Sequence, residues 1–446
     1  MTSAAEQFVS NLNFGAFAKA TELKKRIWFT LGALIIYRLG TYIPLPGIDP
    51  HVLADVFKQN QGGMLGMFDM FAGGALSRMT IFALNIMPYI SSAIIMQLMT
   101  AVSPQLEALK KEGEAGRKKI NQYTRYGTVV IAALQAYGIS VGLEGMTSSA
   151  GAAVMAPGLF FRFQVVVTLV GGTIFLMWLG EQITARGIGN GTSLIIMSGI
   201  VANLPTALAG TLELGRTGAL STAFIIFLLV MSVAVIFFIV FMERAQRRII
   251  IQYPKRQRGN KMTGGESSHL PLKLNTSGVI PPIFASSILL MPITVIGFTA
   301  GTGPEWLTTA AAYLGRGQPV YLFIYISMVV FFAFFYTAVV FNPVDTADNL
   351  KRYGGFIPGI RPGKNTADYL DWVLTRLTVI GAAYLAIICL LPELLISHYS
   401  VPFYFGGTSL LIVVTVTMDT VAQVQSHLLA HQYEGLIKKA KLRGRK

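Results

Sequence analysis

The run TAFIIFLLVMSVAVIFFIVFM, residues 222–242, holds no charged side chain. A helix of about 20 apolar residues crosses the ~30 Å hydrocarbon core of a bilayer, so the run predicts a membrane-spanning helix. Over the whole chain 53% of residues are hydrophobic and only 13% are charged. Soluble domains carry about 25% charged residues. The composition therefore excludes an ordinary soluble domain and indicates a polytopic membrane protein.

Nine further apolar windows accompany this run, and together they predict an all-α protein with ten transmembrane helices. The ten windows are residues 27–46, 80–102, 127–144, 160–180, 192–211, 222–242, 276–299, 320–342, 377–396 and 403–427. The only cysteine, Cys389, lies in the apolar run AIICLL, so it excludes an internal disulfide and is interpreted as a packing residue.

The Lys and Arg residues predict the orientation of these helices. If residues 1–26 are cytoplasmic, then 30 of the 36 Lys and Arg residues fall on the cytoplasmic side. Short cytoplasmic loops carry such an excess. Both termini are therefore expected inside, including the basic tail 428–446. Residues 1–26 are polar and basic and no cleavage site follows, so the first helix is expected to stay in the membrane.

Much of the net charge of +15 gathers in the cytoplasmic segments 103–126, 243–275 and 344–376 and in the tail. Contacts with anionic lipid headgroups explain a few charges beside each helix. They explain less well the two long loops 243–275 and 344–376, where glycine and proline fix turns. We interpret these loops as a docking surface for an acidic partner, either protein or RNA.

Ten spans divide into two sets of five, residues 27–215 and 216–427. Because five is odd, the second set enters the membrane inverted, and inverted repeats commonly place the working site between the halves. PYISSAIIM (88–96) in the first half is echoed by PIFASSILLM (282–291) in the second. A proline inside a span permits a kink. We interpret the echo as a moving pair of helices, with ordinary helix packing as the alternative.

The stretch GGMLGMFDMFAGGALSRM, residues 62–79, lies between the first two spans but cannot span. The uncharged part between Asp69 and Arg78 makes only about 12 Å of helix. An external loop would leave its apolar side chains in water. The stretch therefore predicts a re-entrant segment covered by protein, and we favour a displaceable plug over a static loop.

Charges and motifs inside the spans limit the mechanism. Acidic residues are almost absent from the span centres, whereas ion-coupled transporters place acids there. Arg38 is the one deep charge, and it either pairs internally or lines a polar passage. No GxxxxGK[ST], HExxH or GxSxG pattern occurs. We therefore expect no enzyme and no cofactor, but a passive conduit that is powered by a docked partner. A small-solute secondary transporter with inverted repeats is the alternative.

Six long motifs resemble the SecY family, also called the translocon alpha-subunit family. They are GGALSRMTIFALNIMPYISSAIIMQL, KKEGEAGRKKINQYTRYGT, LMWLGEQITARGIGNGTSLII, GVIPPIFASSILL, PGIRPG and VPFYFGGTSLLIV. The resemblance runs from about residue 20 to the C-terminal tail. It implies two pseudo-symmetric halves around an hourglass channel in the bacterial cytoplasmic (inner) membrane. This channel passes unfolded secretory proteins and releases transmembrane segments sideways into lipid.

The same resemblance implies the partners. They are the membrane subunits SecE and SecG, the SecA ATPase or the ribosome as the source of driving force, signal peptides and unfolded secretory or membrane protein chains, anionic lipids, and SecD, SecF and an insertase as accessory partners.

The resemblance also implies the site residues. The pore ring maps onto Ile86, Ile90, Thr192, Ile196, Ile283 and Ile412. The plug maps onto 62–79, with Met64, Leu65, Met67, Phe68, Met70, Phe71 and Leu76 as its apolar side chains. The lateral gate maps onto Ser91 and Met291, and the docking residues are Lys255, Arg256 and Arg361.

The spacing of the ring residues agrees with a pore. Ile86 and Ile90 are four residues apart, as are Thr192 and Ile196, so each pair shares one helix face. A narrow collar of branched aliphatic side chains dewets and blocks ions. Thr192 departs from the isoleucine that is often found at its position, so the ring is expected to be less uniformly apolar.

Overall fold

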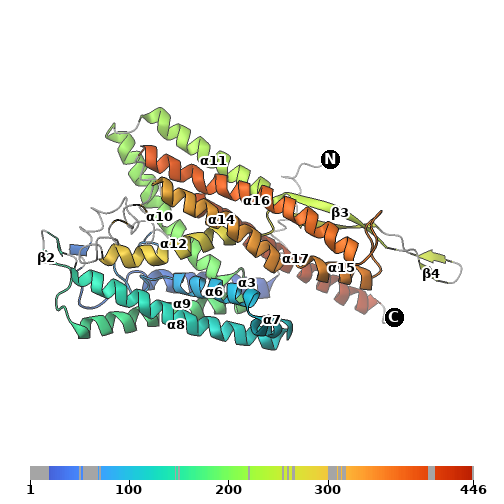
Figure 1. Cartoon of the computed structure of the whole chain (residues 1–446), viewed down its shortest axis with the longest axis horizontal. Helices are drawn as coiled ribbons and strands as arrows, with labels where there is room; N and C mark the ends of the chain where they lie inside the picture. Colours follow the sequence, from blue (N-terminus) through green and yellow to red (C-terminus); the bar gives the residue numbers. More distant parts are fainter. Residues whose placement is uncertain are drawn as a thin grey trace.

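Long helices dominate the computed structural model (Figure 1). It describes residues 20–49, 52–53, 69, 72–145, 147–148, 151–218, 221–253, 256–258, 261–263, 267–299, 309, 313, 318–399 and 407–443. The helices are α3 (Thr21–Gly40), α6 (Met87–Val102), α7 (Pro104–Lys111), α8 (Glu114–Gly145), α9 (Leu159–Arg186), α10 (Gly191–Arg216), α11 (Thr222–Arg244), α12 (Ile280–Thr299), α14 (Pro319–Val340), α15 (Pro343–Arg352), α16 (Lys364–Tyr399) and α17 (Gly407–Arg443).

Each of the ten apolar windows coincides with one of these helices, which confirms an all-α polytopic membrane protein. By length and composition, seven helices among the described residues are able to cross a membrane. Helix α6 is shorter, at 16 residues, and the side chains of α12 are described only as far as Leu289. Helix α3 carries Lys24, Lys25 and Arg26 near its start, so its uncharged part is shorter than that of the seven.

The second window, 80–102, is helical only from Met87, which corrects the prediction at its start. Residues 81–86 form turns, and Met79 and Asn85 adopt positive φ angles of 44° and 51°. Pro88 lies in the first turn of α6, where a helix leaves its N–H groups without partners. The interpretation of Pro88 as a kink within a span is therefore wrong, because no helix precedes it.

Side-chain caps start several of the other helices. The Asn190 side chain accepts a hydrogen bond from the Thr192 N–H at the start of α10. Ser221 caps α11 in the same way, and Asn342 caps α15. These residues are effective caps because their side-chain oxygens replace the missing carbonyl partners of the first helical turn.

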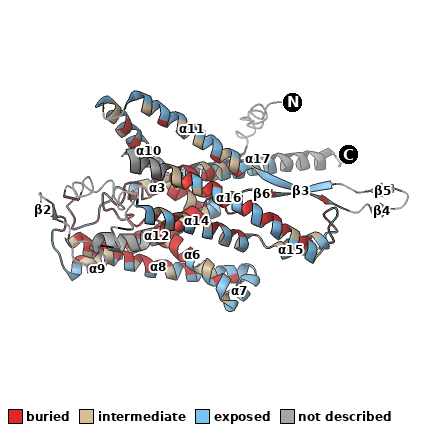
Figure 2. Cartoon of the chain, turned by 45° about the horizontal axis from the view of Figure 1, so that its top comes forward, coloured by how far each residue is buried: buried red, intermediate tan, exposed pale blue. Residues whose placement is uncertain are grey.

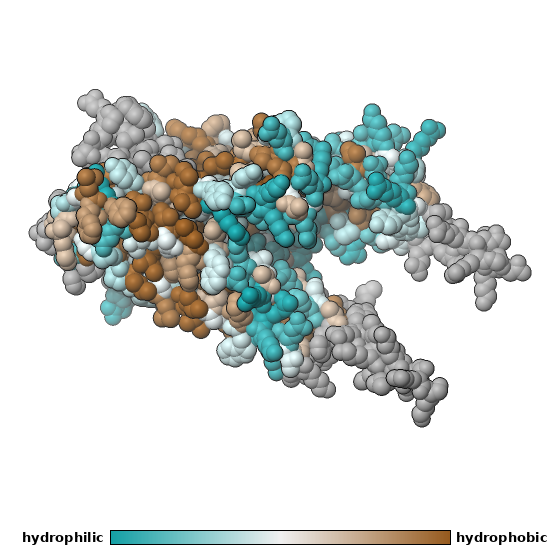
Figure 3. Space-filling model, turned by 90° about the horizontal axis from the view of Figure 1, so that it is seen from below, coloured by the Kyte–Doolittle hydropathy of each residue, from teal (hydrophilic) through white to brown (hydrophobic). Residues whose placement is uncertain are grey.

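One large apolar core joins α3, α6, α8, α9, α10, α12, α14, α16 and α17. Buried residues concentrate along the middle of the bundle, whereas most of α11 is exposed (Figure 2). The exposed face of α11 is apolar, with Phe237 74% exposed. Apolar side chains also form a band on the surface in Figure 3, and polar ones gather toward one end. Such a band is expected where lipid tails replace water.

The two long basic loops fold together into one unit at that polar end, which the sequence had not predicted. Strand β3 (Gln246–Gln252) pairs antiparallel with β6 (Ser267–Lys273). Gln252 and Phe356 exchange both backbone hydrogen bonds, with N···O distances of 2.9 and 3.0 Å. A separate apolar cluster lies beneath, made of Ile249, Leu272, Ile357, Leu370, Val373, Leu374 and Leu377. We call these elements, together with the start of α16, the basic unit.

Further short pairings occur among the described residues, including an isolated bridge between Ile48 and Val154. Strand β4 (Arg256–Arg258) pairs with β5 (Lys261–Thr263) at the tip of the basic unit, and β1 (Thr147–Ser148) pairs with β2 (Gly151–Ala152) near the opposite end of the bundle (Figure 1). The isolated bridge between Pro44 and Thr80 joins the segment after α3 to the segment before α6. This bridge ties the chain just after residues 62–79 to the chain after α3.

Candidate functional site

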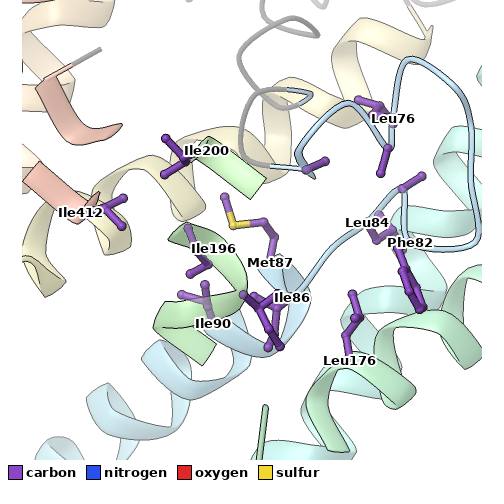
Figure 4. Packing of buried hydrophobic residues seen from close by; sticks show 14 of the residues in the cluster. Leu76, Phe82, Leu84, Ile86, Met87, Ile90, Leu176, Ile196, Ile200 and Ile412 are labelled. Atoms are coloured by element: carbon purple, nitrogen blue, oxygen red, sulfur yellow. The ribbon is translucent and has the colours of Figure 1, made fainter. Parts of the chain in front are cut away.

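The structure brings the predicted ring isoleucines together. Ile86, Ile90, Ile196 and Ile412 belong to one core cluster, each at most 7% exposed, and Ile283 packs against it. Figure 4 shows the first four in one region of the core, contributed by the start of α6, by α10 and by α17. We call this group of buried isoleucines the waist; its role as a pore ring stays a prediction.

The local backbone explains how Ile86 joins this waist from outside a regular helix. It is the N-cap residue of α6, and its carbonyl accepts from the Ile90 N–H at 3.2 Å. The Asn85 side-chain oxygen accepts from the Ile86 N–H at 2.8 Å. Ile86 and Ile90 therefore keep the spacing of a helical turn and point the same way.

Thr192 occupies a different environment from the isoleucines. Its hydroxyl donates to the Asn190 side-chain oxygen at 2.7 Å, at the start of α10. Its methyl carbon would lie 3.4 Å from a Cβ atom built on Gly180 of α9. Thr192 is thus held against α9 by its own cap, and its part in the ring stays a prediction.

A polar cavity of about 530 Å³ adjoins the waist. On each of three helices its lining residues lie about one turn from a ring residue: Ser193 on α10, Ile280 on α12 and Thr415 on α17. Its other polar lining includes Glu243 and Asn275, whose side chains are hydrogen-bonded at 2.7 Å. The cavity therefore lies about one helical turn from the isoleucines on these three helices.

The plug segment packs against the waist from the other side. Leu76 is fully buried and belongs to the same cluster as the ring residues. Ala72, Ala75 and Met79 are buried beside it, each at most 1% exposed. The described part of 62–79 is therefore covered by protein, as a re-entrant segment requires. The other six predicted plug residues, Met64, Leu65, Met67, Phe68, Met70 and Phe71, lie outside the described residues.

Short hydrogen bonds shape this segment. The Asp69 carboxylate accepts from the Ser77 N–H at 2.8 Å, and the Asp69 carbonyl accepts from the Gly74 N–H at 3.0 Å. Burial raises the pKa of Asp69 above its ordinary value, and the bonds from Ser77 oppose that shift. The segment's end is joined to the chain after α3, since Leu45 N–H donates to the Met79 carbonyl at 2.9 Å.

The helices of the predicted gate are in contact. The Ser287 hydroxyl of α12 donates to the Met87 sulfur of α6 at 3.8 Å. Ser91 is also buried, at 4% exposure, whereas the side chain of Met291 lies outside the description. The pairing of Ser91 with Met291 therefore stays a prediction.

Two of the three predicted docking residues are described, and both lie in or near the basic unit. Arg361 is exposed, in the loop between Gly359 and Gly363, which have φ angles of 83° and 106°. Its carbonyl accepts from the Thr366 hydroxyl at 2.9 Å. Arg256 lies on β4, without a described side chain, and Lys255 lies outside the described residues.

Sequence reasoning missed two polar links between helices. Arg125 of α8 binds Glu181 of α9 through two hydrogen bonds of 3.0 and 2.7 Å. Arg162, which falls inside the predicted window 160–180, pairs with Glu144 at 2.6 Å. The only signal of these links in the sequence was the presence of charged residues near the ends of predicted spans. No cluster of His, Cys, Asp or Glu able to hold a metal ion occurs among the described residues.

A polar-lined cavity, a cluster of buried isoleucines and the buried, described part of 62–79 are features of a gated conduit through a membrane. Comparison with known proteins agrees with this class. The family model for SecY matches residues 80–421. The protein translocase subunit SecY of Escherichia coli (strain K12) is 57% identical over 424 residues, which cover 95% of this chain and 96% of that protein. That of Rickettsia conorii is 55% identical over 422 residues, covering 95% and 97%. The chain therefore belongs to the SecY family.

Solved structures show the same fold at lower identity. A structure of a protein-conducting channel aligns with a TM-score of 0.66 at 17% identity, covering 92% of this chain and 93% of that one. Sec61 in a canine ribosome–channel complex aligns with a TM-score of 0.63 at 16% identity and the same coverage. The helical arrangement is thus shared with these two channels.

Proposed function

We propose that this protein is the protein-conducting channel subunit of a Sec translocase in a bacterial cytoplasmic membrane. Unfolded secretory chains pass through the isoleucine waist, and apolar segments leave sideways between α6 and α12 into lipid. The protein is a channel and not an enzyme, so its driving force comes from a partner. The relatives named translocase subunit SecY, and the solved protein-conducting channel, support this assignment.

The order of contacts along α10 carries the proposal. Ser193 lines the polar cavity, Ile196 belongs to the waist, and Gly199 lies against Gly73 of the plug segment. At 1.5 Å per residue these three positions span about 9 Å. The cavity, the isoleucines and the segment 62–79 therefore follow one another along a single helix, which is the order expected of an hourglass channel closed from one side.

The chemistry of the waist suits a substrate of any sequence. Branched aliphatic side chains offer water no hydrogen bonds, so a narrow waist dewets and stops ions at rest. The same side chains make no directional contacts that would favour one passing residue over another. A polypeptide of any sequence can therefore pass while the side chains of the waist stay packed around it.

The basic unit is the docking surface for the motor. SecA or the ribosome binds there, with Lys255, Arg256 and Arg361 as contacts, and SecE and SecG complete the membrane complex. A solved structure of canine Sec61 in a ribosome–channel complex, which shares this fold, supports the ribosome as a partner. Signal peptides enter at the α6–α12 gate, where Ser91 faces Met291 once the gate rearranges. Anionic lipids contact the remaining basic residues, and SecD, SecF and an insertase act as accessory partners.

Both termini are cytoplasmic, supported by the 30 of 36 Lys and Arg residues on that side. The halves 27–215 and 216–427 hinge around the waist, and the plug 62–79 vacates it from the external side.

Reconstitution tests this function directly. Vesicles containing this protein with SecE and SecG receive SecA, ATP and a radiolabelled secretory precursor, and protected precursor is measured after protease digestion. ATP-dependent protection that persists after ion gradients are collapsed is expected. Protection that requires an ion gradient and is indifferent to SecA would favour the secondary-transporter alternative.

A further inference from the structure

Arg38 near the end of α3 reaches the backbone of the plug. Its Nη1 donates to the Gly73 carbonyl at 3.0 Å. Its other contacts are longer: Nη2 donates to the Tyr42 hydroxyl at 3.4 Å, and its guanidinium lies 5.5 Å from the Tyr42 ring centroid. In the described part of the chain no ion pair includes Arg38. The bond to Gly73 is therefore its strongest described contact.

Gly73 fills a space that no other residue fits. A Cβ atom added to it would lie 2.9 Å from the Gly199 Cα and 3.0 Å from the Arg38 Nη1. Its φ of 67° is also in the left-handed region that favours glycine. Gly73 is thus held between Arg38 of α3 and Gly199 of α10, and Gly199 lies about one turn from the waist residue Ile196.

If the plug leaves the waist, the hydrogen bond between Arg38 and Gly73 and the close approach of Gly73 to Gly199 must both be lost. The Gly73 carbonyl would lose a hydrogen bond from a charged donor, which is stronger than a bond between neutral groups. The guanidinium would lose the one short contact that holds it beside the plug. Both losses oppose departure, so the bond raises the cost of opening.

We propose that Arg38 is a positioning residue that latches the plug in the closed channel by holding the Gly73 carbonyl against Gly199. The proposal rests on the proposed function, because it assigns 62–79 the role of a plug. It gives a role to the deep charge for which the sequence left two alternatives, and it predicts that Arg38 controls how often the resting channel opens.

Thiol labelling measures that opening without any substrate. The reporter is Leu76→Cys, since Leu76 is fully buried in the closed state, in a Cys389→Ala background. The complete complex with SecE and SecG is placed in lipid vesicles, and a soluble maleimide is added. Arg38→Met should label about 10- to 100-fold faster than the parent, the factor that corresponds to one hydrogen bond to a charged group.

Two matched variants separate the bond from general effects. Arg38→Lys keeps a charged donor, so its labelling rate should stay within several-fold of the parent. Arg216→Met removes an exposed arginine that pairs only locally with Glu213, and its rate should be unchanged. Chloride leak through channels with native Leu76 should rank the variants in the same order.

Equal labelling of Arg38→Met and the parent would overturn the latch, as would equal acceleration in Arg38→Lys and Arg38→Met. If Arg38→Met fails to assemble, Gly73→Ala tests the same grip without touching the arginine. It should also label faster, and an unchanged rate would overturn the proposal. Failure of the parent to move a precursor, with the labelling order intact, would instead contradict the proposed function.

Discussion

The sulfur of Met87 lies 3.8 Å from the hydroxyl oxygen of Ser287, which joins α6 to α12 across the boundary between the two predicted halves. The two helices run in opposite directions, since α6 ends toward α7 while α12 begins beside β6 at the same end (Figure 1). Because the helices are antiparallel, Ser91, one turn after Met87 on α6, lies level with a part of α12 that comes before Ser287. Met291 comes after Ser287, so it lies further along α12 than the part that is level with Ser91.

We expect a short cross-link between Met87→Cys and Ser287→Cys to stop export. The link ties α6 to α12 at their observed contact, so the halves cannot separate there. The measurement is ATP-driven precursor uptake by vesicles before and after a bifunctional thiol reagent, in a Cys389→Ala background.

Each single cysteine variant treated with the same reagent is the control and should export normally. Ser91→Cys with Met291→Cys should cross-link more slowly in the resting channel and faster once a signal peptide is bound. Full export with the Met87–Ser287 pair linked would refute the assignment of these helices as the gate.

Ile412→Asn should loosen the closed waist. Ile412 is 1% exposed, so asparagine at this position buries a polar amide among apolar side chains. These neighbours offer the amide no hydrogen bond. Such a group costs about 1–3 kcal/mol, which shifts the balance toward the open channel by roughly 5- to 150-fold. Export of precursors with defective signal sequences is the measurement, and it should rise.

Ile412→Leu is the matched control, because it conserves volume and apolarity. It should leave discrimination against defective signals close to that of the parent. Discrimination that is the same in Ile412→Asn and Ile412→Leu would count against Ile412 as a ring residue.

Arg361→Glu should slow SecA-driven export by at least about tenfold while the membrane complex still assembles. Arg361 is exposed on the basic unit, so its reversal places a negative charge where an acidic partner is proposed to dock. ATP-dependent uptake and copurification with SecE report the two effects separately.

Lys118→Glu is the control for charge alone, since Lys118 is exposed at the start of α8 and lies outside the basic unit. Its export rate should remain near that of the parent. Equal loss in both variants would show a general effect of surface charge and remove the specific docking role of Arg361.

The buried carboxyl of Asp69 makes plug packing pH-dependent. Burial raises its pKa, so the folded plug binds a proton more tightly than the unfolded chain does. This contribution to stability is fully present below the ordinary pKa of 3.8 and is lost as pH rises through the raised value. The packed plug should therefore gain stability as pH falls from neutrality.

Asp69→Asn isolates this effect, because the amide oxygen can still accept from the Ser77 N–H. The Tm of the parent minus that of Asp69→Asn should increase as pH is lowered from about 7 to 4, by the equivalent of ~1.4 kcal/mol for each unit of raised pKa. A difference that is constant over this range would contradict the assignment.

Local chemistry explains which features of the fold were predictable. A run such as 222–242 has no other stable place than a bilayer or a deep core, so its position as α11 followed from composition. The missing N–H of Pro88 indicated either a kink or a helix start in the second span. Whether that point is a kink or a helix start depends on the turns at 81–86, and these are set by contacts with the chain after α3.

The candidate site was predictable only where a family motif named its residues. Ile86, Ile90, Ile196 and Ile412 meet as expected, but an isolated isoleucine in a span carries no signal that separates a waist from ordinary core. The link between Gln252 and Phe356 was invisible, because the two residues are far apart in sequence and bond through backbone groups that every residue has.

The sequence by itself determined the membrane class, the ten helical segments and the predicted sidedness, because hydrophobic length and Lys/Arg bias act within one segment at a time. Only the tertiary structure decided which segments meet: Gly73 against Gly199, Met87 against Ser287, and Arg38 on the plug carbonyl. Such contacts depend on how helices pack in three dimensions, and a close backbone approach or a side-chain-to-carbonyl bond leaves no periodic trace along the chain.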